Sequence, residues 1–155
     1  MSVAYIGLGS NLGEREENLR EALRRLEAAG CRVDAISSFH DTAPAEQASP
    51  PRFLNAAARI ETELSPRDLL ELLLRVEREL GRERPYPGAP RTVDLDLLLY
   101  GDAVIDQPGL LVPHPRLHRR AFVLHPLAEI APDVVHPLTG TTVAALLATL
   151  DQPGP

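Results

Sequence analysis

Hydrophobic and polar positions change their spacing along the chain, and these changes predict its elements. Residues 3–9 are a short apolar run that ends in glycines, a pattern typical of a buried strand. Residues 14–29 repeat apolar side chains every three or four positions and stop before Gly30, which predicts an amphipathic helix. Residues 31–42 are rich in β-branched and aromatic types and residues 53–63 alternate, so both segments are predicted as strands.

A second helix and a fourth strand follow, and together they indicate the fold class. Ser65 and Pro66 are typical of a helix start, and the apolar spacing continues to about Leu80. Residues 92–100 are predicted as the next strand. The order strand, helix, strand, strand, helix, strand is that of the ferredoxin-like split unit. We therefore predict an α+β fold, with a mainly antiparallel sheet that carries both helices on one face.

The rest of the chain is interpreted as a proline-rich C-terminal extension of the same domain. Eleven of the 15 prolines lie in residues 85–155, and no repeat or linker separates a second domain. The pattern within the extension predicts a short strand near 103–105, an extended segment at 112–114 and helices near 119–130 and 142–150. Residues 1–155 are thus expected to form a single domain.

Composition narrows the class of protein. The 155 residues are 44% hydrophobic and 25% charged, as in ordinary globular domains. No apolar run reaches the ~18 residues of a membrane span, and the first residues lack the basic flank of a secretory signal. Because Cys31 is the sole cysteine, the chain is expected to be cytoplasmic, with no membrane partner.

Charge argues against one class of partner and leaves another open. The 16 basic residues are all arginines, and 22 acidic residues outnumber them, which gives a net charge of −6. An acidic balance argues against general binding to nucleic acid, whereas a small polyanion needs only a local basic cluster. We therefore expect small-molecule substrates and no nucleic acid, and we expect the chain to be a monomer.

The strongest chemical signal is a pair of carboxylates, Asp94 and Asp96, in the strand predicted at 92–100. Because side chains alternate along a strand, both carboxylates point to one face, with Cα atoms ~7 Å apart. Two carboxylates side by side on an apolar strand repel each other, and a bound divalent cation offsets that cost. Oxygen ligands without cysteine favour Mg²⁺; the alternative is a solvated strand end that binds no metal.

Two arginine clusters flank this strand and strengthen the metal interpretation. The first lies before the strand and comprises Arg82, Arg84 and Arg91. The second lies within residues 114–120 and also holds two histidines. Guanidinium groups bind phosphate oxygens in a bidentate manner, so the clusters and the acids predict a metal–triphosphate site without a Walker loop. In the alternatives, Arg82 and Arg84 cap the preceding helix, or His114 and His118 ligate zinc, which we disfavour.

A glycine-rich segment, residues 7–13, follows the first predicted strand. It is similar to the dinucleotide-binding fingerprint, but its third glycine falls one position late and the order of elements is not that of a Rossmann sheet. We interpret the three glycines, Gly7, Gly9 and Gly13, as a tight strand-to-helix turn, with Asn11 as a weaker candidate for a site.

Two aromatic residues and one amide indicate a planar ligand. Phe53 and Asn55 begin the strand at 53–63, and Phe122 begins a helix of the extension. Either phenylalanine alone is explained by core packing. A buried amide needs hydrogen-bond partners, and an amide beside aromatic rings suits a planar heterocycle.

Five motifs follow one another along the chain: Gly9-Ser10-Asn11-Leu12, Phe53-Leu54-Asn55-Ala56-Ala57, Pro90-Arg91-Thr92-Val93-Asp94-Leu95-Asp96, Val112-Pro113-His114 and Arg120-Ala121-Phe122. In order and spacing they resemble the 6-hydroxymethyl-7,8-dihydropterin pyrophosphokinase family of folate biosynthesis, over about residues 3–150. The resemblance implies a ferredoxin-like fold. It also implies transfer of the β,γ-diphosphate of ATP to the hydroxymethyl group of the pterin, with release of AMP.

The same resemblance implies roles for individual residues. Asp94 and Asp96 match the ligands of two Mg²⁺ ions and, with Arg82 and Arg91, the catalytic groups. The residues that match ATP contacts are Glu77, Arg82, Arg84, Arg91, Leu97, Leu111, His114 and Arg120. The residues that match pterin contacts are Thr42, Ala43, Phe53, Asn55 and Phe122.

Two other functions are compatible with the same pattern. A ferredoxin-like ligand-sensing module without catalysis would have the acidic pair merely solvated. An ordinary small-molecule kinase would transfer one phosphoryl group and yield ADP. The nucleotide product separates these alternatives from the pyrophosphokinase.

Overall fold

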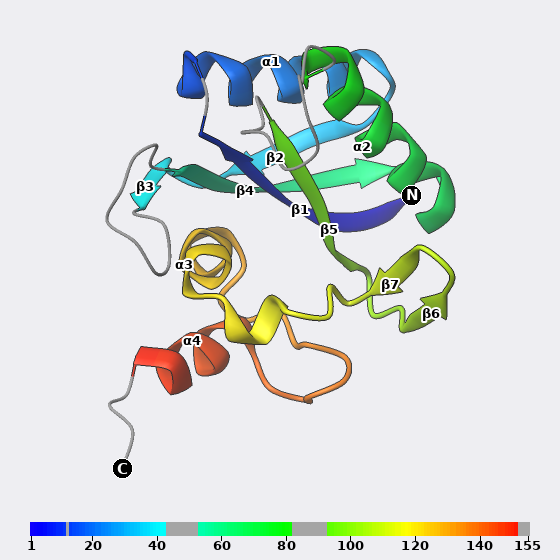
Figure 1. The fold of residues 1–155 in the computed structure, drawn as a ribbon. Helices are drawn as coiled ribbons and strands as arrows, with labels where there is room; N and C mark the ends of the chain where they lie inside the picture. Colours follow the sequence, from blue (N-terminus) through cyan, green and yellow to red (C-terminus); the bar gives the residue numbers. More distant parts are fainter. Residues whose placement is uncertain (12, 43–52, 82–92, 152–155) are drawn as a thin grey trace.

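The computed structural model describes residues 1–11, 13–42, 53–81 and 93–151, the side chains of Thr42 and Asp151 excepted (Figure 1). In chain order the elements are β1 (Ser2–Ser10), α1 (Arg15–Ala28), β2 (Arg32–Ile36), β3 (His40–Thr42), β4 (Phe53–Thr62), α2 (Pro66–Gly81), β5 (Asp94–Tyr100), β6 (Ile105–Gln107), β7 (Leu110–Val112), the 3-10 helix η1 (Leu117–Arg119), α3 (Ala121–Ile130) and α4 (Val143–Asp151). A mixed fold of helices and antiparallel sheet is thereby confirmed.

The main sheet is antiparallel and has the strand order β2-β4-β1-β5, with β3 also paired to β4. β1 lies in the middle and pairs along its whole length with β4, from Ser2 opposite Thr62 to Ser10 opposite Leu54. β5 is the edge strand beside β1. The acids of β5 therefore lie next to the central strand.

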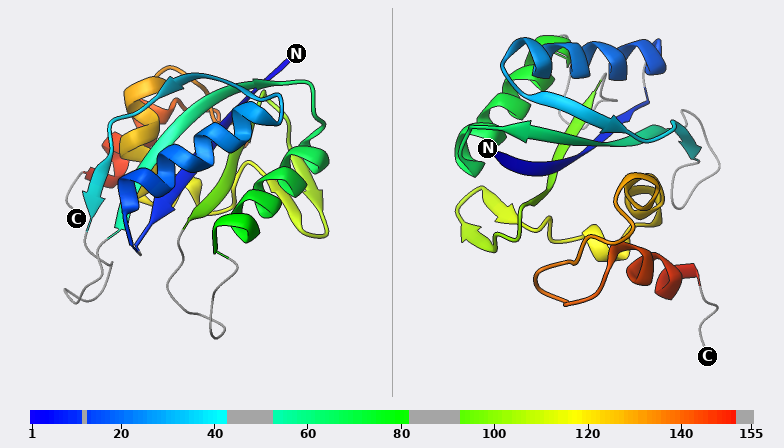
Figure 2. Two further views of the ribbon diagram at one scale, coloured as in Figure 1. Left: turned by 90° about the horizontal axis from the view of Figure 1, so that it is seen from above. Right: turned by 180° about the vertical axis from the view of Figure 1, so that it is seen from behind.

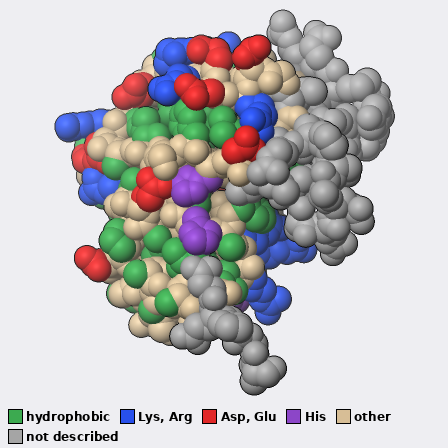
Figure 3. Space-filling view, turned by 90° about the vertical axis from the view of Figure 1, so that its left-hand side faces the viewer, with side chains coloured by type: hydrophobic (Ala, Val, Ile, Leu, Met, Phe, Trp, Pro, Cys, Tyr) green, Lys and Arg blue, Asp and Glu red, His purple; other side chains and the backbone are tan. Residues whose placement is uncertain are grey.

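The two helices of the first half lie side by side on one face of the sheet (Figure 2). Arg25 of α1 reaches Glu79 of α2, at 3.0 Å between Nη1 and Oε1. The outer surface of α1 carries charges of both signs (Figure 3), with Arg20 paired to Glu16. Exposed pairs of this kind contribute little, so apolar burial against the sheet holds the helices in place.

The C-terminal extension covers the opposite face of the sheet, where α3 lies with α4 beyond it (Figure 1). The core between the sheet, α1 and α2 includes Ile6, Leu8, Leu19, Leu26, Ile60, Leu69, Leu73 and Val76. The core between the sheet and the extension consists of Tyr5, Ala57, Leu98, Leu99, Leu117, Leu124, Leu127, Ala131 and Val143. The sheet is thus buried on both faces, and the extension is one of its two covering layers.

The predicted single strand at 31–42 was wrong, because residues 37–39 leave the ladder between β2 and β3. Serine side chains explain the break: Ser37 Oγ accepts a hydrogen bond from the backbone N–H of Ala57. Ser38 donates both its backbone N–H and its hydroxyl to Glu129 of α3. Side-chain hydrogen bonds of Ser37 and Ser38 therefore take the place of the regular backbone ladder here.

The predicted short strand near 103–105 and extended segment at 112–114 are corrected to a hairpin, in which β6 and β7 pair with each other. Pro108 and Gly109 connect the two strands, and Gly109 has φ +74°. This dipeptide is typical of a type II turn, in which glycine takes the position with positive φ. For the other elements, the predicted bounds differ from the observed ones by only one or two residues. Thr92, in the strand predicted at 92–100, lies outside the described residues.

Glu129 fastens α3 to the segment between β2 and β3. Its carboxylate accepts the Ser38 hydroxyl at 2.6 Å and the Ser38 N–H at 3.0 Å, and it also contacts Nε2 of His40. These hydrogen bonds, those from Ser38 first, lower the pKa of Glu129 from an ordinary 4.5 to about 2. The pKa of Glu129 is lower in the folded chain than in the unfolded chain. Its carboxylate therefore stabilises the fold at pH values above 4.5, and this contribution is lost as pH falls toward 2.

We expect Glu129→Gln to lower the free energy of unfolding at pH 7 by roughly 1 kcal/mol, since the carboxylate is partly exposed and its contacts are screened. Urea unfolding of the variant and the parent chain at pH 7 and pH 3 measures this difference, which should shrink at pH 3. Glu63→Gln changes an exposed carboxylate and serves as the control. An equal loss at both pH values would contradict the role given to the charge.

Candidate functional site

Two glycines of β1 lie between the acids of β5 and the amide of β4. Gly9 pairs with Asn55 on one side and with Asp94 on the other. Gly7 pairs with Asp96 one row further along the same face. A Cβ atom on Gly9 would lie 3.1 Å from Oδ1 of Asn55, so glycine leaves the room that this amide occupies. The row of Asn55, Gly9 and Asp94 forms an open floor on the sheet.

The interpretation as a strand-to-helix turn was therefore wrong for Gly7 and Gly9, although it holds for Gly13. β1 stays paired through Ser10, and the turn falls later, at Gly13, where φ is +69°. The spacing of two residues between Gly7 and Gly9 was the signal in the sequence for their actual role. Alternate residues share one face of a strand, and glycine in a strand marks a place where another group approaches closely.

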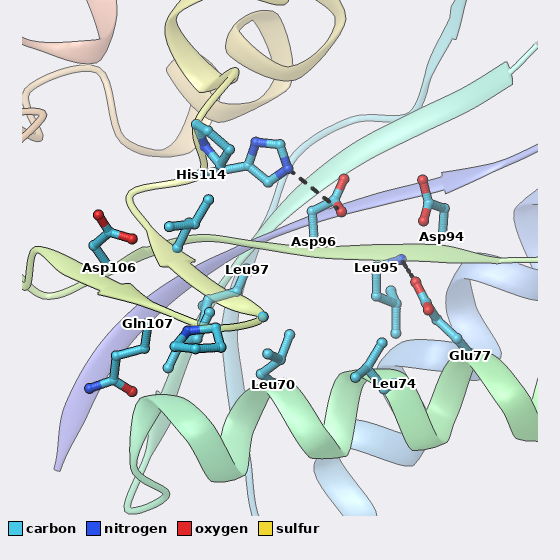
Figure 4. A pocket seen from close by; sticks show the side chains of 15 residues that line it. Leu70, Leu74, Glu77, Asp94, Leu95, Asp96, Leu97, Asp106, Gln107 and His114 are labelled. Carbon is cyan, nitrogen blue, oxygen red and sulfur yellow. Dashed lines mark hydrogen bonds and ion pairs between the residues drawn. The ribbon is translucent and has the colours of Figure 1, made fainter.

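The acidic pair lies beside a histidine on the segment after β7. Nε2 of His114 is 3.9 Å from Oδ1 of Asp96, and Figure 4 shows the imidazole directed at this carboxylate. Nδ1 of His114 accepts the backbone N–H of Arg116 at 3.2 Å, so the neutral ring carries its proton on Nε2. Burial, followed by the positive charges of Arg120 and Arg116, lowers the pKa of His114. His114 thus presents an N–H donor toward Asp96 without adding a positive charge.

The first cavity, of about 690 Å³, lies between the sheet and the start of α3. Its described lining is Gly7, Leu8, Gly9, Phe53, Asn55, Ala56, Asp94, Asp96, Arg119, Arg120, Ala121, Phe122 and Val123. The guanidinium of Arg120 lies 5.6 Å from the centre of the Phe122 ring, a cation–π distance. The cavity brings together two predicted rings, a buried amide and both acids. Ala43 and the side chain of Thr42 lie outside the described residues.

The second cavity, of about 750 Å³, lies on the other side of the acids, between α2, β5 and the β6–β7 hairpin. Its described lining is Leu70, Leu74, Glu77, Asp94, Leu95, Asp96, Leu97, Asp106, Gln107, Pro108, Gly109, Leu110, Leu111, His114 and Pro115 (Figure 4). Four of the residues predicted to contact a nucleotide are in this lining, namely Glu77, Leu97, Leu111 and His114. Arg82, Arg84 and Arg91 lie outside the part of the chain that the structure describes.

Glu77 has a contact that its position in the sequence does not reveal. Its Oε2 accepts the backbone N–H of Leu95 at 2.6 Å, from the outer side of the edge strand (Figure 4). Leu95 stands between Asp94 and Asp96, so this bond holds the backbone that carries both acids. Periodicity gives no signal for such a contact, because the two residues belong to different elements.

The acids are the only residues common to the linings of both cavities, within the described part of the chain. A molecule in the first cavity and a molecule in the second therefore meet at Asp94 and Asp96. The zinc alternative finds no support, because the His118 ring faces His136, with centroids 6.0 Å apart, while His114 faces Asp96. Among the described residues, no group of three His, Cys, Asp or Glu side chains is arranged to hold a metal.

Comparison with known proteins gives one consistent result. Residues 5–132 match the family described as 7,8-dihydro-6-hydroxymethylpterin-pyrophosphokinase. The chain is 47% identical over 134 residues to the 2-amino-4-hydroxy-6-hydroxymethyldihydropteridine pyrophosphokinase of Bacillus subtilis, covering 86% of this chain and 80% of that one. It is 46% identical over 155 residues to the protein of the same name from Methylorubrum extorquens, covering 99% and 97%.

Two longer proteins also match. The chain is 40% identical over 141 residues to the folic acid synthesis protein fol1 of Pneumocystis carinii, covering 91% of this chain but 19% of that protein. A crystal structure of Plasmodium falciparum HPPK-DHPS has the same fold, with a TM-score of 0.78 at 14% identity, covering 96% of this chain and 44% of that one.

Proposed function

The chain belongs to the 7,8-dihydro-6-hydroxymethylpterin-pyrophosphokinase family, and on that premise we propose which of its residues carry out the transfer. The reaction moves a pyrophosphoryl group from ATP to hydroxymethyldihydropterin in folate synthesis. The proposal assigns one substrate to each cavity and transfer of the β,γ-diphosphate, with release of AMP, to the acids between them. The observation that carries it is the pair of cavities that share Asp94 and Asp96.

The first cavity is proposed to bind the pterin. Phe53 and Phe122 stack on the two faces of the bicyclic ring, and Asn55 hydrogen-bonds its polar edge. Support comes from the position of all three side chains in one lining, together with the burial of Asn55, which is only 7% exposed. Thr42 and Ala43 are proposed to complete these contacts.

The second cavity is proposed to bind ATP. Leu97 and Leu111 contact the base, and Glu77 lies near the nucleotide while it also holds the backbone of Leu95. His114 lines the second cavity and Arg120 lines the first, and both are proposed to bind the triphosphate where it extends past the acids. Arg82, Arg84 and Arg91 are proposed to bind the same phosphates, with Arg82 and Arg91 acting in catalysis.

The chemistry of the donors fits magnesium. Two carboxylates on one strand face, with no thiolate in the described linings, are hard ligands that leave room for water and phosphate oxygens. The family uses ATP with Mg²⁺, and we propose that Asp94 and Asp96 hold two ions. When bound, these ions supply neutralisation of the triphosphate charge.

The chain's own contribution is proposed to be positioning and charge stabilisation. The glycine floor of β1 is proposed to place the pterin beside the acids. The N–H of His114, which faces Asp96, and the guanidinium of Arg120, which lies beside the Phe122 ring, are proposed to contact the transferred group. Groups held in advance of the reaction need no reorganisation when charge develops, which lowers the barrier.

The proposal also covers the type of fold, the number of domains, the oligomeric state and the location of the protein. We propose a ferredoxin-like arrangement, supported by the antiparallel order β2-β4-β1-β5 with α1 and α2 on one face. Residues 1–155 are proposed to be a single domain with a covering C-terminal extension, monomeric and cytoplasmic. No helix in the described ranges is both long enough and apolar enough to span a bilayer.

Identification of the nucleotide product tests the proposed function. The chain is incubated with ATP, Mg²⁺ and 6-hydroxymethyl-7,8-dihydropterin, and the products are separated by anion-exchange chromatography. We expect AMP and the pterin diphosphate in equal amounts. ADP would instead support the ordinary kinase, and binding of both substrates without turnover would support the ligand-sensing module.

A further inference from the structure

The β6–β7 hairpin makes a whole wall of the second cavity. Residues 106–111, which are consecutive, all line it opposite α2 and β5. β6 and β7 pair only with each other among the described strands, and each has three residues. An isolated two-stranded hairpin is marginally stable in water. The wall therefore needs an anchor outside its own ladder.

Arg67, in the first turn of α2, provides such an anchor at the turn of the hairpin. Its Nη1 and Nη2 atoms both donate to the backbone carbonyl of Pro108, each at 3.1 Å. Nη2 also donates to Oε1 of Gln107 at 3.2 Å. A planar guanidinium is suited to such forked contacts, which fix direction as well as distance. The buried side chains of Leu110, beside the turn, and of Val112, at the other end of the hairpin, also join the core.

The guanidinium also lies close to the glycine of the turn. A Cβ atom on Gly109 would be 3.8 Å from Nη1 of Arg67, an ordinary contact distance. Arg67 itself is absent from the described lining of the cavity. It therefore contacts the hairpin on the side away from the cavity.

We propose that Arg67 is a positioning residue for the nucleotide: by clamping the Pro108–Gly109 turn to α2, it holds the hairpin wall at the distance that the base requires. The inference rests on the proposed assignment of ATP to the second cavity. Without the clamp the hairpin samples more conformations, and ATP binding has to order it again. That cost appears in the affinity for ATP and leaves the chemistry at Asp94 and Asp96 unchanged.

Steady-state kinetics of Arg67→Ala tests the proposal. We expect the KM for ATP to rise about tenfold, with less than a twofold change in kcat and in the KM for the pterin. Arg67→Lys should recover only part of the loss, because one ammonium cannot donate to Pro108 and Gln107 in the same forked geometry. Arg75→Ala is the matched control, since Arg75 lies on the same helix, is exposed and is paired with Glu79.

Hydrogen exchange provides a readout independent of activity. In the absence of nucleotide, the amides of residues 105–112 should exchange faster in Arg67→Ala than in the parent chain, while those of β1 are unchanged. An unchanged KM for ATP, or unchanged exchange in the hairpin, would overturn the proposal. Both outcomes are distinct from failure of the proposed function, which would appear as the absence of AMP in the parent chain.

Discussion

Replacement of Asp96 by asparagine is expected to reduce turnover by roughly 10³-fold while the chain remains folded. Asp96 is shared by both cavities and faces the N–H of His114, so it lies where the two substrates meet. The amide keeps the shape of the side chain but removes the negative charge that attracts the metal. Because Asp94 and Asp96 are like charges on one strand face, neutralising one of them removes their repulsion, so the free energy of unfolding should stay equal or rise.

Turnover at saturating ATP and pterin measures the effect, and thermal unfolding of the same preparation confirms that the variant is folded. Added Mg²⁺ should restore little activity, because a ligand has been lost. Asp102→Asn is the control: this exposed acid lies two residues after the end of β5 and lines neither cavity. Activity of Asp96→Asn close to that of the parent chain would contradict the assignment of the metal to this residue.

Features set by local spacing could be predicted from the sequence. The bounds of α1 and α2 were predicted within a residue or two, because the apolar residues of an amphipathic helix recur in the sequence with the helical period. The acids were expected on one face because strand alternation is equally local, and both of them line both cavities. The order of the first six predicted elements then implied the antiparallel sheet.

Features set by contacts between distant segments could not be predicted. The break after β2 depends on Ser38 and Glu129, which are 91 positions apart. The bulge in β5 is another example, because the register shift leaves Leu98 as an extra residue beside β1. Leu98 and Leu99 then both face the core under α3, an arrangement that simple alternation does not allow. Burial of the second sheet face likewise depends on where the extension folds back.

The residues of the candidate site show the same distinction between local patterns and contacts of distant segments. Phe53 and Phe122 come from β4 and α3, far apart in the sequence, and residue types alone favoured core packing for each ring. The amide beside the rings indicated a planar ligand, and the resemblance, through the order of the motifs, implied that this ligand is the pterin. The first cavity brings the two rings together. The bond from Glu77 to Leu95 and the clamp by Arg67 belong to no motif and required the fold. The roles of Arg82, Arg84 and Arg91 remain predictions.

Asn55→Ala is expected to raise the KM for the pterin between about tenfold and a hundredfold, with little change in the KM for ATP. Asn55 is buried on β4, in the lining of the first cavity and not of the second. The loss of its amide removes hydrogen bonds to the pterin edge, and the cost falls on the substrate whose polar atoms are left unpaired. Initial rates measured while each substrate is varied in turn separate the two KM values.

A second variant alters Gly9, which lies beside the same amide on the neighbouring strand β1. Gly9→Ala places a Cβ atom 3.1 Å from Oδ1 of Asn55, so the amide has to shift by a few tenths of an ångström, and the KM for the pterin should rise in the same direction. Asn18→Ala is the control, because this amide donates to Ser10 at 3.4 Å and lines neither cavity. It should reduce stability without moving either KM. If both variants raised the KM for ATP as much as the KM for the pterin, the amide would support the sheet rather than bind the pterin. Damage to the sheet would then affect both cavities, because both are lined by Asp94 and Asp96.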